Sequence, residues 1–224
     1  MARRFGCEFE FSSDWDAVEA AVRAAIPRRD LYVSKSHHDS NNNRKWHLKT
    51  DATTTAELAT PVCSLKDLPR VRRVIGSLRR AGVRTTKEDG FHVHVNIADV
   101  DRKKLVAAWL RAERAILSLV PRHRRTNGYC YKLSRGSPPE RLFDADRTAE
   151  DHHAIISFSR FGDIGTVEIR PAEGTTDAEF AGHWVRLCVG LVEYAKRADP
   201  YDILLGKPPS MSLDELMDEL RRPP

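Results

Sequence analysis

Hydrophobic and polar residues alternate one by one in several stretches of the chain, which is the pattern of a β-strand with one buried face. The clearest stretches are residues 4–11, 90–97, 154–160 and 165–170. The last two predict a hairpin that turns at Phe161-Gly162-Asp163. Shorter strands are expected over residues 46–49 and 54–60.

Apolar residues at every third or fourth position predict helices in most of the intervening segments. The expected helices cover residues 15–26, 65–81, 101–120 and 177–194, and a short helix is expected within residues 211–222. Ser12, Ser13 and Asp14 can cap the first of them, and Gly82 can close the second. Residues 34–45 contain no aliphatic side chain and are expected to form a surface loop.

Strands joined by hairpins, without regular alternation of strand and helix, favour an α+β fold with a mostly antiparallel sheet. In such a fold the helices cover one face of the sheet, and the other face is free to carry an active site. The 224 residues fit one domain, since a single core grows to about 250 residues before a chain divides. We therefore predict one catalytic domain over residues 1–224, with residues 200–224 as a C-terminal extension.

The composition indicates a globular protein, because 41% of the residues are hydrophobic and 31% are charged. No apolar run approaches the roughly 20 residues of a membrane-spanning helix, so no membrane partner is expected. The N-terminus lacks the apolar stretch of a signal peptide, which favours a cytoplasmic location. The four cysteines are widely spaced and are expected to be free thiols. A net charge of +5 suits an anionic partner, which could be a nucleic acid, a nucleotide or a carboxylate.

Polar residues recur in pairs on the strand faces opposite the apolar ones. Residues i and i+2 of a strand point to the same side, so each pair shares one face of the sheet. Glu57 lies on a separate short strand and adds a further carboxylate. Together these positions predict one polar site made of Glu8, Glu10, Glu57, His92, His94, Glu168 and Arg170.

Several carboxylates in one place need a counter-charge, because two of them ~4 Å apart repel by about 4 kcal/mol at an effective dielectric constant of ~20. Oxygen ligands with one imidazole and no thiolate suit Mg²⁺ or Mn²⁺ better than a softer metal. The alternative is a solvated sheet face with cross-strand ion pairs, which explains any one pair well but the whole set poorly.

Two other functions are compatible with these residues. The first is a two-metal-ion hydrolase or nuclease that acts on an anionic substrate, since carboxylates with histidine also activate water. The second is a nucleic-acid-binding module that uses the arginine-rich helix, which contains Arg70, Arg72, Arg73, Arg79 and Arg80. We do not favour nucleic acid as a partner, because clustered charges are more often a solvated helix face.

Five short motifs follow one another along most of the chain. They are Gly6-Cys7-Glu8-Phe9-Glu10-Phe11; Trp46 to Asp51 with Glu57-Leu58-Ala59-Thr60-Pro61; Gly90-Phe91-His92-Val93-His94-Val95; Arg125-Thr126-Asn127-Gly128-Tyr129-Cys130; and Thr166-Val167-Glu168-Ile169-Arg170 with Thr175 and Trp184. In this order they resemble the motifs of the amidoligase family. These enzymes are carboxylate-amine ligases of phages, bacteria and fungi, related to glutamine synthetase and glutamate-cysteine ligase.

The resemblance implies a glutamine-synthetase-like sheet, ATP, and two or more divalent ions, Mg²⁺ or Mn²⁺. By position, Glu10 and Glu57 would hold one ion. Glu8, His92 and Glu168 would hold the ion nearer the ATP phosphates.

The implied reaction is amide formation between a carboxylate and an amine of amino acids or peptides, through an acyl phosphate. His94, Arg125 and Arg170 are the candidates for stabilising the charge that moves during phosphoryl transfer, and His94 and Arg170 would also contact the nucleotide. Lys49 and Asp51 could approach the nucleotide or the amine, and residues 34–45 could close over it as a lid. The two substrates and the oligomeric state stay open.

Overall fold

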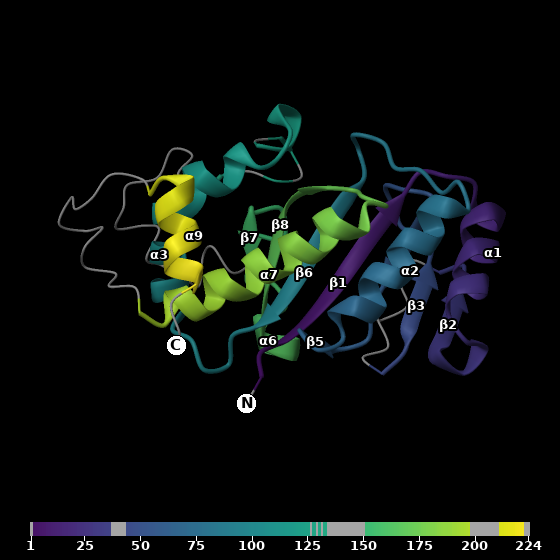
Figure 1. The fold of residues 1–224 in the computed structure, drawn as a ribbon, viewed down its shortest axis with the longest axis horizontal. Helices are drawn as coiled ribbons and strands as arrows, with labels where there is room; N and C mark the ends of the chain where they lie inside the picture. The colour runs from purple at the N-terminus through teal and green to yellow at the C-terminus, as the bar shows by residue number, and fades with distance from the viewer. Residues whose placement is uncertain are drawn as a thin grey trace. The chain divides into compact units, whose positions relative to one another are not determined.

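The computed structural model describes residues 2–36, 44–125, 127–128, 130, 132–133, 151–197 and 211–221 (Figure 1). Its strands are β1 (Arg4–Phe11), β2 (Leu31–Ser34), β3 (Trp46–Lys49), β4 (Ala56–Ala59), β5 (Cys63–Ser64), β6 (Gly90–Asn96), β7 (Ile156–Ser157) and β8 (Thr166–Glu173). Its helices are α1 (Trp15–Ala25), α2 (Leu68–Arg80), α3 (Arg102–Ser118), α6 (Phe161–Ile164), α7 (Ala178–Ala195) and α9 (Leu213–Arg221), with the short 3-10 helices η1 (Arg28–Asp30) and η2 (Arg122–Arg124).

The strands form one mixed sheet in the order β2-β3-β4-β1-β6-β8-β7, with β5 paired to β1. Strand β1 is antiparallel to β4 and β5, β3 is antiparallel to β4, and β7 is antiparallel to β8. Only β2 and β3 are parallel among the pairs whose registers are described. The α+β class with a mostly antiparallel sheet is therefore confirmed, while the likeness to the glutamine synthetase fold stays a prediction.

The described residues group into two compact units. The first contains the described residues within 1–93 and 172–186, and the second contains those within 94–171 and 187–224. Strands β6 and β8 and helix α7 each contribute residues to both units. Nothing in this grouping tests the expected single domain over residues 1–224, and the expected start of the C-terminal extension at residue 200 lies outside the described residues.

In the first unit, β1 alternates as its sequence predicts. Its odd-numbered residues from Phe5 to Phe11 are buried, and Phe9 stacks on Phe91 of β6 with ring centroids 4.4 Å apart. Helix α1 begins at Asp14, whose carboxylate accepts a hydrogen bond from the Ala17 main-chain N–H. Helices α1 and α2 lie side by side (Figure 1). Their apolar stripes fill the core, so the polar side of β1 stays available for a site.

The arginine-rich face of α2 is largely paired with acidic residues of the same unit. Arg70 lies 2.7 Å from Asp30, Arg79 lies 3.4 Å from Asp177, and Arg72 pairs with Glu179. A paired face is what a solvated helix surface would show. A nucleic-acid partner for this helix stays a prediction that we do not favour.

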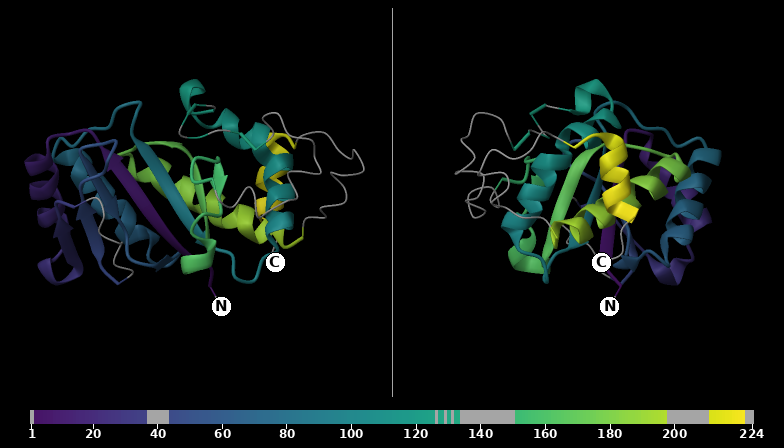
Figure 2. Two further views of the ribbon diagram at one scale, coloured as in Figure 1. Left: turned by 180° about the vertical axis from the view of Figure 1, so that it is seen from behind. Right: turned by 60° about the vertical axis from the view of Figure 1, so that its left-hand side comes forward.

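In the second unit, α3 carries the buried Trp109 and lies beside α9 (Figure 2). The two segments are joined where the Met211 main-chain N–H donates to the Arg111 carbonyl at 2.8 Å. Helix α9 lies within the expected range of 211–222.

The hairpin of β7 and β8 is confirmed, with Ile156 opposite Ile169, but its connection differs from the expected tight turn. Residues 161–164 form the single helical turn α6, and Gly165 closes it with a φ of 67°. A glycine adopts this left-handed conformation without the Cβ clash that other residues meet, so the turn ends there rather than at Gly162.

Strand β2 was not expected from the sequence, which placed a loop from residue 34 onward. Four residues without clear alternation form this strand by pairing with β3, a contact that only the tertiary structure supplies. Most of the proposed lid, residues 37–43, lies outside the described residues. The expected free thiols are confirmed, since all four cysteines are buried and none of them forms a disulfide. Among the described helices, none has the length and apolar character needed to cross a membrane.

Candidate metal-binding site and its surroundings

Three strands of the first unit bring acidic side chains and a lysine onto one polar face. In the antiparallel pair of β1 and β4, Glu10 lies directly opposite Glu57. In the next pair, Lys49 of β3 also lies opposite Glu57. Residues that face each other across antiparallel strands have Cβ atoms about 5 Å apart, which is close enough for their side chains to interact. The strand register therefore brings Glu10, Glu57 and Lys49 together, while the roles that the sequence assigned to them stay predictions.

Glu57 is the most deeply buried carboxylate of this group, with only 5% of its surface exposed. Burial and the negative charge of Glu8 raise its pKa to about 8, and Lys49 opposes this shift from 3.3 Å away. One lysine does not balance the local negative charge. The cluster therefore carries excess negative charge, which a bound cation would compensate.

His92 of β6 lies against both carboxylates of β1. Its Nδ1 is 3.9 Å from a Glu8 oxygen, its Nε2 is 3.8 Å from a Glu10 oxygen, and its side chain is only 7% exposed. The second oxygen of Glu10 accepts a hydrogen bond from the Gly90 main-chain N–H. We define the carboxylate cluster as Glu8, Glu10, Glu57 and His92.

Gly90 is required by the close approach of its neighbours. A Cβ atom at this position would lie 2.5 Å from the His92 Nε2 and 3.1 Å from a Glu10 oxygen. Any larger residue would displace the histidine from the carboxylates. The glycine at the start of this motif is thus explained by packing against the carboxylate cluster.

Asp89 precedes this strand and was not selected from the sequence. Its side chain is fully buried and accepts hydrogen bonds from the main chain and hydroxyl of Ser12, at 3.1 and 2.6 Å, and from the main chain of Thr86 at 2.7 Å. Its carbonyl accepts the Gly174 main-chain N–H at 2.8 Å. Asp89 therefore ties the end of β1 to the start of β6, and no periodic pattern could have indicated this contact.

The second unit contains the remaining predicted residues. On β8, Glu168 is buried and forms an ion pair with Arg170, two residues along the same strand. Ser157 of β7 lies opposite Glu168. His94, which follows His92 by two residues on β6, is half-buried. Residues two positions apart on a strand point to the same side, which explains why Glu168 pairs with Arg170.

Arg124 and Arg125, at the end of η2, have different surroundings, which the sequence did not indicate. Arg125 donates from its Nε to the Val120 carbonyl at 3.1 Å, close to the end of the helix. Arg124 is only 4% exposed and donates to the main-chain carbonyl of Arg170 at 3.1 Å. Its Nε is buried and has no hydrogen-bond partner among the residues that the structure describes. The role assigned to Arg125 stays a prediction, and Arg124 is the arginine buried beside β8.

Thr175 and Trp184, two further residues of the motifs, have structural roles. The Thr175 hydroxyl accepts a hydrogen bond from the Asp177 main-chain N–H at 3.0 Å, and the Asp177 carboxylate caps α7 by accepting from residues 179 and 180. Trp184 of the same helix is buried. The fourth motif is only partly covered, because Thr126 and Tyr129 lie outside the described residues.

The donor atoms of the carboxylate cluster fit a hard divalent cation. They are mainly carboxylate oxygens with one imidazole, and no thiol is among them. Mg²⁺ and Mn²⁺ prefer such oxygen ligands, and Mg²⁺ commonly keeps positions open for phosphate oxygens.

Comparison with known proteins gives one family. A family model described as "Putative amidoligase enzyme" matches residues 1–192, which is most of the chain. A comparison with curated proteins finds no match.

Proposed function

This chain belongs to the amidoligase family, a family of ligase-type enzymes, and we propose that it is an ATP- and Mg²⁺-dependent ligase that joins a carboxylate to an amine. Mn²⁺ is the alternative ion. The substrates that we propose are amino acids or peptides. A two-metal-ion hydrolase is not favoured, since the family match extends over residues 1–192.

The observation that carries this proposal is the carboxylate cluster of the first unit. Glu10 and Glu57 face each other across β1 and β4, so they are suited to hold one ion between them. His92 lies 3.9 Å from Glu8, which supports these two as ligands of a second ion. The third ligand that we propose for that ion is Glu168. A bound ion would supply positive charge to the phosphate oxygens of ATP.

The proposed reaction has two steps. An oxygen of the substrate carboxylate attacks the γ-phosphorus of ATP, the bond to the β-phosphate oxygen breaks, and ADP leaves. The amine nitrogen then attacks the carbon of the acyl phosphate, inorganic phosphate leaves, and the amine loses a proton to give the amide. Negative charge moves between phosphate oxygens in both steps, so positive groups that face these oxygens would lower the barrier.

Arginines of the second unit are the groups that we assign to this stabilisation. Arg170 has its side chain directed by β8 and is held by Glu168. Arginine presents a planar fork of donors that matches phosphate or carboxylate oxygens. Arg124 is buried, and one of its donors has no partner among the described residues, so it is a second candidate for an anionic ligand beside the predicted Arg125. His94, with Lys49 of the first unit, completes the proposed nucleotide-contacting set.

The direct test is ADP release in a screen of amino acids and short peptides as carboxylate and amine substrates. The proposal predicts ADP release that needs both substrates and a divalent ion. Glu10→Gln should abolish it with the fold retained. Asp16→Asn, the same carboxylate-to-amide change at an exposed position of α1, should leave it unaltered. Full activity of the Glu8→Gln, Glu10→Gln and Glu168→Gln variants would exclude this function.

Ion binding can be tested without any substrate. Mn²⁺ titration followed by electron paramagnetic resonance should detect bound ion in the wild-type protein. The Glu10→Gln and Glu57→Gln variants should bind Mn²⁺ at least about tenfold more weakly, because each removes a proposed ligand. An unchanged affinity in both variants would show that the carboxylate cluster is not a metal site.

A further inference from the structure

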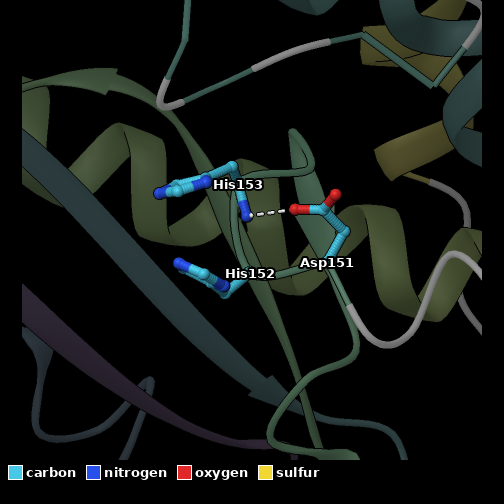
Figure 3. Close-up of side chains that lie close together, drawn as sticks. All are labelled: Asp151, His152 and His153. Atoms are coloured by element: carbon cyan, nitrogen blue, oxygen red, sulfur yellow. Dashed lines mark hydrogen bonds between the residues drawn. The ribbon is translucent and has the colours of Figure 1, made fainter.

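A short turn of the second unit brings two histidines and an aspartate together at the surface. The turn consists of Asp151, His152 and His153 (Figure 3), and two further residues connect it to β7. His152 is exposed, and Asp151 and His153 are partly exposed.

The turn is held by two hydrogen bonds of its own. The Asp151 carboxylate accepts the His153 main-chain N–H at 3.0 Å, and the Asp151 carbonyl accepts the Ala154 N–H at 3.1 Å. The next residues, Ala154 and Ile155, are buried, and the Ile155 carbonyl accepts the Arg170 main-chain N–H at 3.1 Å. The turn is thus anchored to β8 and holds its three side chains in a limited range of positions.

The donor atoms lie nearly close enough for one ion. One donor atom from each residue lies within 4.8 Å of the other two. The two imidazole rings extend to the same side of the turn, with centroids 3.9 Å apart and planes inclined by 44° (Figure 3). Donors around a tetrahedral Zn²⁺ with bonds of about 2.0–2.1 Å lie roughly 3.3 Å apart. A shift of about 1.5 Å, within reach of side-chain rotation, would bring them to that distance.

We propose that Asp151, His152 and His153 form a binding site for a divalent transition-metal ion, with Zn²⁺ as the ion that best suits their donor atoms. Two imidazole nitrogens and one carboxylate oxygen are a ligand set for Zn²⁺, and three protein ligands leave one tetrahedral position open. The exposure of His152 gives the ion access from solvent.

This site is chemically distinct from the carboxylate cluster. Its nitrogen donors disfavour Mg²⁺, which prefers oxygen ligands. An excess of Mg²⁺ should therefore occupy the carboxylate cluster and leave the histidine turn open to Zn²⁺. The inference does not depend on the proposed ligase activity, because Zn²⁺ binding is measured directly.

The experiment is calorimetric titration of the untagged full-length protein with Zn²⁺ at pH 7 in excess Mg²⁺. The wild-type protein should bind one equivalent of Zn²⁺. The His152→Asn single variant and the His152→Asn/His153→Asn double variant should lose at least about tenfold in affinity. Asp151→Asn keeps the oxygen that accepts the His153 N–H but removes the charge, so it should bind more weakly than wild type. His183→Asn, an exposed histidine on α7, is the matched control and should bind as wild type does.

Substituting Co²⁺ adds a spectroscopic readout, since a tetrahedral Co²⁺ site absorbs visible light and the carboxylate cluster alone would not give this signal at comparable strength. The absorbance should be lost in the double variant and retained in His183→Asn. Wild-type protein that binds no Zn²⁺ under these conditions would overturn the proposal. So would a double variant with unchanged stoichiometry and affinity.

Discussion

Replacing Glu57 by glutamine should change how the stability of the metal-free protein depends on pH. The pKa of Glu57 is raised from 4.5 to about 8 because the side chain is buried next to Glu8. In the unfolded chain the group returns to its ordinary value. Between these two pH values the folded protein therefore holds a proton that the unfolded chain has lost, and stability falls as the pH rises.

The size of the effect follows from the width of that interval. The contribution of protonated Glu57 is fully present below about pH 4.5 and is lost as the pH rises towards 8. Each pH unit inside the interval is worth about 1.4 kcal/mol. From pH 5 to pH 7 the free energy of unfolding of the wild-type protein should thus fall by about 2.7 kcal/mol relative to that of Glu57→Gln, because the glutamine amide does not ionise. The midpoint of thermal unfolding should shift by about 5–11 °C for a chain of this size.

The assay is urea unfolding at several pH values in the presence of a chelator. The comparison uses the slope with pH, because the glutamine also alters the contact of residue 57 with Lys49 and this adds a nearly constant cost. Asp16→Asn, which removes an exposed carboxylate on α1, should follow the wild-type slope. Parallel pH profiles for wild type and Glu57→Gln would refute the reasoning. Mg²⁺ at a concentration 100 times its dissociation constant should raise the free energy of unfolding of the wild-type protein by about 2.7 kcal/mol, because it binds the folded state.

Three further predictions follow from the described contacts. Gly90→Ala places a Cβ 2.5 Å from the His92 Nε2, so Mn²⁺ affinity should fall at least about tenfold, as electron paramagnetic resonance would show; unchanged affinity would contradict the close approach. Arg124→Lys should lower kcat/KM about 10- to 100-fold by removing a charge-assisted hydrogen bond worth roughly 1.5–3 kcal/mol, while Arg122→Lys, at an exposed position of η2, stays near wild type; equal losses in steady-state kinetics would contradict this role of Arg124. Phe9→Ala should destabilise the fold by about 3–5 kcal/mol in urea, because its buried ring stacks on Phe91; a loss below about 1 kcal/mol would argue against that packing.

Local pattern alone predicted much of the fold. The alternation in residues 4–11 and 90–97 located β1 and β6, because one face of each strand packs in the core. The same period placed Glu8 with Glu10, His92 with His94, and Glu168 with Arg170. Asp14 capped α1 as expected, since a side-chain oxygen before an apolar stripe satisfies the first free N–H groups of a helix.

Tertiary structure alone decided the remaining features. Strand β2 exists because it pairs with β3, and Asp89 is buried because Ser12 and Thr86 donate to it from distant parts of the chain. The turn of η2 buries Arg124 and directs Arg125 to the Val120 carbonyl, although the two residues are neighbours of identical type. Periodicity describes which side of one element a residue occupies. Strand register, burial and the partner of each charge depend on segments far apart in the sequence, so only the folded chain determines them.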